Sequence, residues 1–134
     1  MANAIYPLYK QALLDGDANI DLNDGTVKVA LVDTGTYTYS AAHQFLTSLT
    51  GVVGTAQTIN NTTVANGVFD GDNVTYTAVT GNSIEALVIY IDTGVAATSR
   101  LVAYIDTGVT GLPGLTPNGG DITVTWNASG IFAL

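Results

Sequence analysis

The sequence predicts an all-β fold, an antiparallel β-sandwich or small barrel of about eight short strands with jelly-roll-like connections. Runs of β-branched and aromatic residues recur at short spacing and are separated by Gly, Asn, Asp and Pro, which is the pattern of short strands joined by turns. One run is almost repeated, because LVIYIDTGV at 87–95 returns as LVAYIDTGV at 101–109. Each copy is predicted to be a strand that ends in an Asp-Thr-Gly turn.

The chain has 134 residues, which is the length of one domain that buries roughly two-thirds of the surface exposed by its unfolded form. Neither a linker nor a change in composition divides it, so residues 1–134 are expected to form a single domain. Within it, 1–15 are predicted to be an N-terminal helical arm and 19–134 the β-sandwich.

The N-terminal helix is predicted over residues 5–14. Pro7 suits the first turn of a helix, and Asp15-Gly16 is expected to end it. A second, short inserted helix is expected over 41–49, with Ser40 as its N-cap residue. Apolar side chains at i, i+3 and i+4 spacing would share one face of the first helix: Ile5, Leu8, Tyr9, Ala12 and Leu13.

The first two strands are expected at 20–22 and 26–32, as a hairpin around the Asn-Asp-Gly turn at 23–25. In the longer strand, Val27, Val29 and Leu31 would face the core and Lys28 the solvent. The near-repeat is expected to form a hairpin of 84–91 and 100–106, because its connection is too short for a parallel crossover. Residues 108–120, rich in Gly and Pro, are expected to be a loop. Further strands are predicted at 52–59, 64–69, 74–79, 121–126 and 131–134.

Composition restricts the classes of function. Hydrophobic residues make up 47% of the chain and charged residues only 10%, with a net charge of −8 and no cysteine. So few charges favour a surface that packs against other subunits, and three cationic side chains are too few for a nucleic-acid interface. No apolar run approaches the ~18 residues of a membrane span, and the N-terminus lacks the features of a signal peptide. We expect no nucleic-acid partner, no membrane and no cofactor, in a soluble protein that stays where it is translated.

The Asp-Thr-Gly tripeptide occurs at 33–35, 92–94 and 106–108, and the same tripeptide forms the catalytic loop of aspartic proteases. Such a protease needs two carboxylates about one hydrogen bond apart that share a proton. In an antiparallel hairpin, Asp92 and Asp106 would lie at opposite edges of the sheet. The motif is therefore predicted to be a turn and the protein not to be an enzyme, with a dimeric aspartic protease acting through Asp33 as a minor alternative.

No metal site is expected. Residues 15–26 have the acidic spacing of a calcium loop, but Ile20 stands where an EF-hand needs Gly and Thr26 where it needs Glu. The acidic turn of Asp70, Asp72 and Asn73 is a weak candidate for a looser calcium site.

Histidine and aromatic residues supply the remaining candidates. His43 has no nucleophile motif to accompany it, so it is expected to be a partly buried helix residue. Four aromatic residues could form a platform that stacks against sugars, but their alternating strand positions favour the core: Tyr76, Tyr90, Tyr104 and Trp126.

Both ends of the chain carry a resemblance. The opening MANAIYPLYKQALL, followed by DLNDGTVKVALVD, and the ending NGGDITVTWNASGIFAL resemble those of the head decoration (cement) proteins of tailed bacteriophages. The resemblance implies a structural virion protein that binds the outer surface of an assembled head through the major capsid protein and stabilises contacts between capsomers. It also implies a homo-oligomer, with a trimer favoured, found in the host cytoplasm before assembly and on the capsid surface afterwards.

The apolar face of the N-terminal helix is the expected capsid or oligomer contact. Two alternatives remain, a carbohydrate-binding β-sandwich module and a tail or adsorption component. The first would expose aromatic rings, whereas the decoration reading predicts binding to capsids. The contact candidates are Ile5, Tyr6, Leu8, Tyr9 and Leu13.

Overall fold

The computed structural model describes residues 3–109, 112 and 114–134. In the part of the chain that it describes, the fold is all-β and sandwich-like, as predicted, with one α-helix and one 3-10 turn. The elements in chain order are β1 (Ala4–Ile5), α1 (Pro7–Asp15), β2 (Thr26–Val32), η1 (Leu46–Ser48), β3 (Val52–Thr58), β4 (Thr63–Ala65), β5 (Val68–Asp70), β6 (Val74–Tyr76), β7 (Ala86–Asp92), β8 (Arg100–Ile105), β9 (Ile122–Val124) and β10 (Phe132–Ala133).

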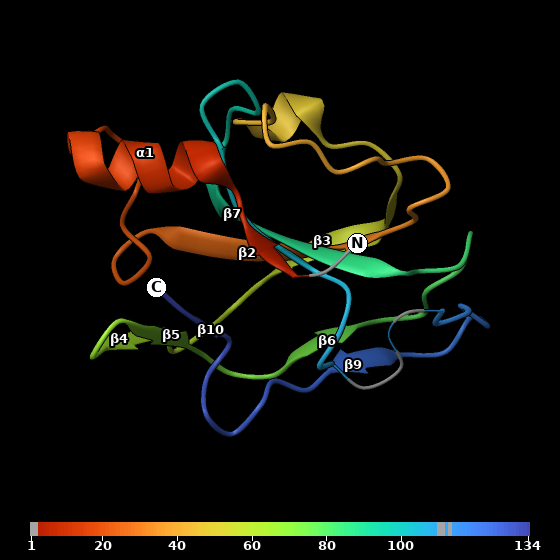
Figure 1. Ribbon diagram of the computed structural model, residues 1–134. Helices are drawn as coiled ribbons and strands as arrows, with labels where there is room; N and C mark the ends of the chain where they lie inside the picture. Colours follow the sequence, from red (N-terminus) through yellow and green to blue (C-terminus); the bar gives the residue numbers. More distant parts are fainter. Residues whose placement is uncertain (1–2, 110–111, 113) are drawn as a thin grey trace.

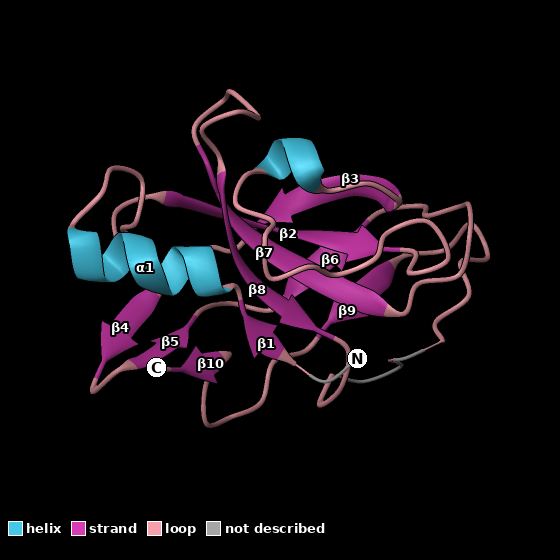
Figure 2. Cartoon of the chain, turned by 45° about the horizontal axis from the view of Figure 1, so that its top comes forward, coloured by secondary structure: helices cyan, strands magenta, loops and turns pink. Residues whose placement is uncertain are grey.

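The strands form one large sheet and two small ones. The main sheet is antiparallel in the order β1-β8-β7-β2-β3, and the smaller sheets are β10-β5-β4 and β6-β9. Figure 1 shows α1 and η1 on one face of the main sheet and both small sheets on the other. Figure 2 shows the twist of the main sheet, in which β7 and β8 run side by side through the centre. Sheets of five, three and two strands do not establish a jelly roll.

Both faces of the main sheet are covered, and this explains its composition. Every residue of β8 is buried, as is every residue of β7 before Asp92. In β2, Val27, Val29 and Leu31 face the core as predicted and Lys28 is partly exposed. Ala30 and Val32 are buried too, because another layer covers the face of β2 that the sequence predicted to be exposed to solvent. A strand covered on both faces is apolar throughout rather than alternating.

The near-repeat forms the predicted antiparallel hairpin of β7 and β8. The hairpin expected between 20–22 and 26–32 is wrong, since β2 pairs with β7 and β3 instead. Asp21 Oδ1 accepts the backbone N–H groups of Asn23 and Asp24 at 2.8 and 3.0 Å. This side-chain turn takes the place of the ladder that a strand at 20–22 would need.

Residues 64–69, predicted as one strand, form a tight hairpin of β4 and β5. Asn66 and Gly67 lie at its tip with φ of 53° and 77°. Two successive residues of positive φ are typical of a type I′ turn, which Asn-Gly favours and which joins neighbouring antiparallel strands.

The helix predicted at 41–49 is wrong apart from the three residues of η1. The segment instead runs along the start of β8. Leu46 N–H donates to the carbonyl of Ser99 at 2.8 Å, and Leu101 N–H donates to the carbonyl of Gln44 at 2.9 Å. Backbone groups that bond to a neighbouring strand are not available to a helix.

The N-terminal segment is part of the fold. Ile5 pairs with Ala103 in the main sheet, so the helix begins at Pro7 rather than at residue 5. Tyr6, Tyr9 and Ala12 are buried, and α1 packs against β8. Residues 4–15 therefore lie against the sheet and do not extend from it as an arm.

The C-terminal strands lie close to their predicted positions. In 121–126, β9 occupies Ile122–Val124, with Val124 and Trp126 buried and the two threonines exposed. The predicted loop at 108–120 includes 110, 111 and 113, which lie outside the described residues. Among the described residues, no helix is long and apolar enough to cross a membrane.

Candidate functional site

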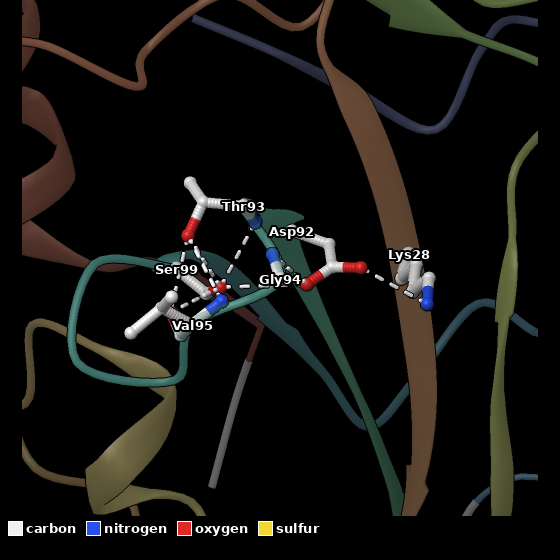
Figure 3. Close-up of polar contacts among 6 residues, drawn as sticks. All are labelled: Lys28, Asp92, Thr93, Gly94, Val95 and Ser99. Atoms are coloured by element: carbon white, nitrogen blue, oxygen red, sulfur yellow. Dashed lines mark hydrogen bonds and ion pairs between the residues drawn. The ribbon is translucent and has the colours of Figure 1, made fainter.

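The Asp-Thr-Gly segments of β2 and β7 are side-chain turns that close the strands. Asp92 Oδ1 accepts the N–H of Gly94 at 3.0 Å, and Asp92 Oδ2 forms an ion pair with Lys28 Nζ at 3.0 Å (Figure 3). At the end of β2, Asp33 Oδ1 accepts the N–H of Gly35 at 2.8 Å. A carboxylate that accepts the backbone N–H two residues on is a common way to stop a strand. The repeated motif therefore has a structural role at both sites, as a turn that ends the strand.

The carboxylates of the near-repeat are far apart. Ile91 lies opposite Arg100 in the β7–β8 ladder, so Asp92, the last residue of β7, lies next to the start of β8. Asp106 follows the other end of β8. Six residues of extended chain separate the two ends by roughly 20 Å. The prediction that Asp92 and Asp106 occupy opposite edges is confirmed.

Asp33 and Asp106 lie at the same end of the main sheet, because β2 and β8 both run antiparallel to β7. With β7 between them, two strand spacings or roughly 10 Å separate the strand ends, whereas a protease dyad shares one proton. Hydrogen bonds from Gly35 N–H and from Asn82 Nδ2 hold the pKa of Asp33 below its usual range. A carboxylate held in its charged form favours the turn over the protease.

The turn carboxylates make stability depend on pH. Hydrogen bonding to Gly94 and pairing with Lys28 lower the pKa of Asp92, and the pKa of Asp33 is lowered as well. As pH falls below about 4, the unfolded chain binds protons before these native carboxylates do, so this stabilisation is complete above about pH 5 and is lost on acidification. We expect the unfolding temperature to decrease as the pH is lowered from 5 to 3, a range of roughly one pH unit on either side of the pKa of a free carboxyl group. The decrease should be smaller in Asp92→Asn.

The control for this measurement is Asp17→Asn. Asp17 is exposed, and its side chain makes no hydrogen bond or ion pair with any described residue. Its variant should keep the slope of the wild type. An unfolding temperature that is the same at about pH 5 and about pH 3 would contradict the stabilising role of the turn carboxylates. So would an equal dependence on pH in Asp92→Asn and Asp17→Asn.

The side chains of the weak calcium candidate form hydrogen bonds within the chain. Asp70 Oδ1 accepts the N–H of Gly71 at 2.8 Å, Asp72 Oδ2 accepts Asn61 Nδ2 at 2.6 Å, and Asn73 Oδ1 accepts the N–H of Trp126 at 3.0 Å. Among the described residues, no group of three or more His, Cys, Asp or Glu side chains could hold a metal ion. The three oxygens therefore shape the turn between β5 and β6.

The single histidine and the four aromatic candidates belong to the interior. His43 lies in the loop before η1 rather than in a helix and is partly buried, and its Nδ1 shares a hydrogen bond of 2.8 Å with the Tyr37 hydroxyl. The core assignment of the aromatic residues is confirmed, because none of the four is more than 8% exposed: Tyr76, Tyr90, Tyr104 and Trp126.

The helix candidates divide into two groups. Tyr6 and Tyr9 are 0% and 1% exposed, so their side chains stabilise the monomer and cannot contact a partner on this surface. Ile5, Leu8 and Leu13 are half-buried and reach the surface. The predicted apolar face is therefore mainly the face that packs on the sheet.

The most exposed apolar side chain of the helix was missed. Leu14 is 90% exposed and lies off the i, i+3, i+4 face that the sequence indicates. It borders an apolar groove of about 520 Å³ between α1 and the chain end, where Leu134 is 64% exposed. The sequence feature that could have indicated this site is a leucine in the last helical turn that lies outside the apolar face. The groove is lined by Ile5, Lys10, Leu13, Leu14, Ala133 and Leu134.

Lys10 gives this groove a distinctive charge. Lys28 is paired with Asp92, and Arg100 is only 5% exposed. Lys10 is exposed and forms no ion pair with a described residue, so among the described Lys and Arg side chains it is the most accessible to a partner.

Compared with known proteins, the chain matches no protein-family model, and no curated protein matches its sequence.

Proposed function

We propose that this chain is a structural virion protein that decorates a bacteriophage head. It would bind the outer surface of the major capsid protein and stabilise contacts between capsomers. The observation that carries the proposal is the apolar groove of α1 and the chain end, with the side chain of Leu14 90% exposed at its rim. An exposed apolar side chain beside a groove is typical of a protein-binding surface.

Three further features support this function. The main sheet is covered on both faces, which makes it a rigid support for a surface contact. Two of the candidate catalytic carboxylates, Asp33 and Asp92, accept backbone N–H groups of the turns that follow them. The terminal segments carry the resemblance to decoration proteins, and α1 and the chain end both line the groove. A repeated, weak apolar contact gains strength when many copies bind one shell, and further strength if the protein is a trimer.

The test is co-sedimentation with empty heads assembled from the cognate major capsid protein. Leu14→Asp should reduce the bound fraction by about tenfold or more, because a buried charge would lie in the contact. Removal of residues 1–14 is unsuitable, since Tyr6 and Tyr9 are buried in the monomer. Sedimentation velocity of the free protein measures whether the proposed trimer forms.

The matched control is Val95→Asp. Val95 is 57% exposed in the loop between β7 and β8, so its substitution places the same charge on the surface away from the groove. It should bind heads like the wild type. Equal binding by Leu14→Asp and the wild type would refute the groove as the contact, and no binding by the wild type would refute the decoration function.

A further inference from the structure

The chain contains two Asn-Gly sequences, at 66–67 and 118–119. Asparagine is among the residues that limit the chemical lifetime of proteins. A glycine after it leaves the backbone nitrogen open to close approach, because glycine has no Cβ. Asn66 and Asn118 are both exposed. Exposure therefore does not distinguish the two sites, whereas their hydrogen bonds do.

The first site lies at the tip of the β4–β5 hairpin, at the edge of a small sheet (Figure 2). Neither the Asn66 side chain nor the Gly67 N–H makes a hydrogen bond with a described residue. All three residues of β4 are exposed. A hairpin that buries so little of one strand opens locally at low cost. Such opening lets the Asn66 side chain and the Gly67 nitrogen approach each other.

Hydrogen bonds hold both reacting groups of the second site. The Gly119 N–H donates to the carbonyl of Val79 at 2.8 Å, and Asn118 Oδ1 accepts the N–H of Gly120 at 2.9 Å. The Val79 N–H in turn donates to the carbonyl of Gly120 at 3.0 Å. Val79 is buried in the core, so this loop is tied to a fixed part of the fold. The bonds of the Gly119 nitrogen and the Asn118 side chain must break before these two groups can react.

We propose that Asn66 is a site of spontaneous deamidation and isomerisation, and that the fold protects Asn118 from the same reaction. The Gly67 nitrogen attacks Cγ of Asn66. An N–Cγ bond forms, the Cγ–Nδ2 bond breaks, and ammonia leaves with the proton of the Gly67 N–H. Water then opens the cyclic succinimide. Cleavage of the new N–Cγ bond gives aspartate, and cleavage between the nitrogen and the backbone carbonyl carbon gives isoaspartate.

Isoaspartate at this position changes the hairpin tip. Its backbone runs through the former side chain, which lengthens the turn and adds a carboxylate. The length of the turn fixes the register of the two strands, so the pairing of β4 with β5 is disturbed. The Gly67 carbonyl accepts the N–H of Leu134 at 2.9 Å, and Leu134 lines the apolar groove. The reaction itself does not depend on whether the chain decorates a capsid.

The test is mass spectrometry of the folded full chain after incubation in mildly alkaline buffer. Trypsin cleaves after Lys28 and Arg100, which places Asn66 and Asn118 on different peptides. We expect Asn66 to deamidate about tenfold faster than Asn118 or more, because two hydrogen bonds of the reacting groups protect the second site. Incubation in heavy-oxygen water labels the carboxylates that form in the folded chain and separates them from those formed during digestion.

The control is the same incubation in concentrated guanidinium chloride. Both asparagines precede glycine, so their rates should become similar once the chain is unfolded and the protecting hydrogen bonds are lost. A ratio of rates that stays the same in the denaturant would assign the difference to local sequence and overturn the protection by the fold. The proposal is also overturned if Asn66 stays intact in the folded chain, or if Asn118 reacts there as fast as Asn66.

Discussion

Ile89→Ala is expected to lower the free energy of unfolding by about 2–5 kcal/mol, and the unfolding midpoint by roughly 8–20 °C. Ile89 is 0% exposed in β7, the centre of the main sheet. It lies opposite Val29 on one side and Ala103 on the other. Layers cover both faces of the sheet, so the cavity left by the deleted atoms cannot collapse onto solvent. Chemical denaturation measures the loss.

The opposed pair of Ile89 and Ala103 explains the single difference within the near-repeat. The two copies differ only at this position, and the larger residue of one strand lies directly opposite the smaller residue of the other. Ala103→Ile should cost about 1–3 kcal/mol by overpacking.

The exchanged pair provides the control. The double variant Ile89→Ala/Ala103→Ile conserves volume and should be more stable than the sum of the single changes predicts. Val95→Ala, at an exposed position, should change stability by at most about 0.5 kcal/mol. If Ile89→Ala matched Val95→Ala, the buried central position of β7 would be contradicted.

The sequence predicted those strands whose residues determine their own conformation. β2, β7 and β8 are continuous runs of β-branched and aromatic residues, and each ends at Asp-Thr-Gly. Their local preference and their burial agree, so the pattern was sufficient. The Asn-Gly turn at 66–67 carried an equally clear hairpin signal, but it lies within a run that reads as one strand.

Pairings between distant segments could not be predicted in the same way. Ala4–Ile5 joins β8 across about a hundred residues, and the segment around Leu46 bonds to Ser99 instead of forming a helix. Neither short segment has enough residues to show a periodicity of its own. Tertiary hydrogen bonds decide the conformation of such segments.

The groove required the fold for the same reason, because it combines the last turn of α1 with the chain end. The helix pattern identified the apolar face correctly, but that face packs on the sheet, and the exposed Leu14 lies beyond it. A helical pattern indicates which side is buried, and only the neighbouring segments show what remains open.

Gly51→Ala is expected to destabilise the chain by about 2–4 kcal/mol, the sum of backbone strain and steric overlap. Gly51 has φ of 67°, and its carbonyl accepts the N–H of Asp33 at 2.8 Å. A Cβ at this position would lie 2.8 Å from the Asp33 carbonyl oxygen and 3.0 Å from Thr36 Cβ. The backbone of the Asp33 turn would have to move, and chemical denaturation measures the cost.

Gly16→Ala separates the two contributions. Gly16 ends α1 with φ of 69°, almost the same as Gly51, but a Cβ there meets nothing within 4 Å. Its variant should therefore lose only about 1–2 kcal/mol, from left-handed strain. The difference between the variants measures the contact with the Asp33 turn, and equal losses would contradict that contact.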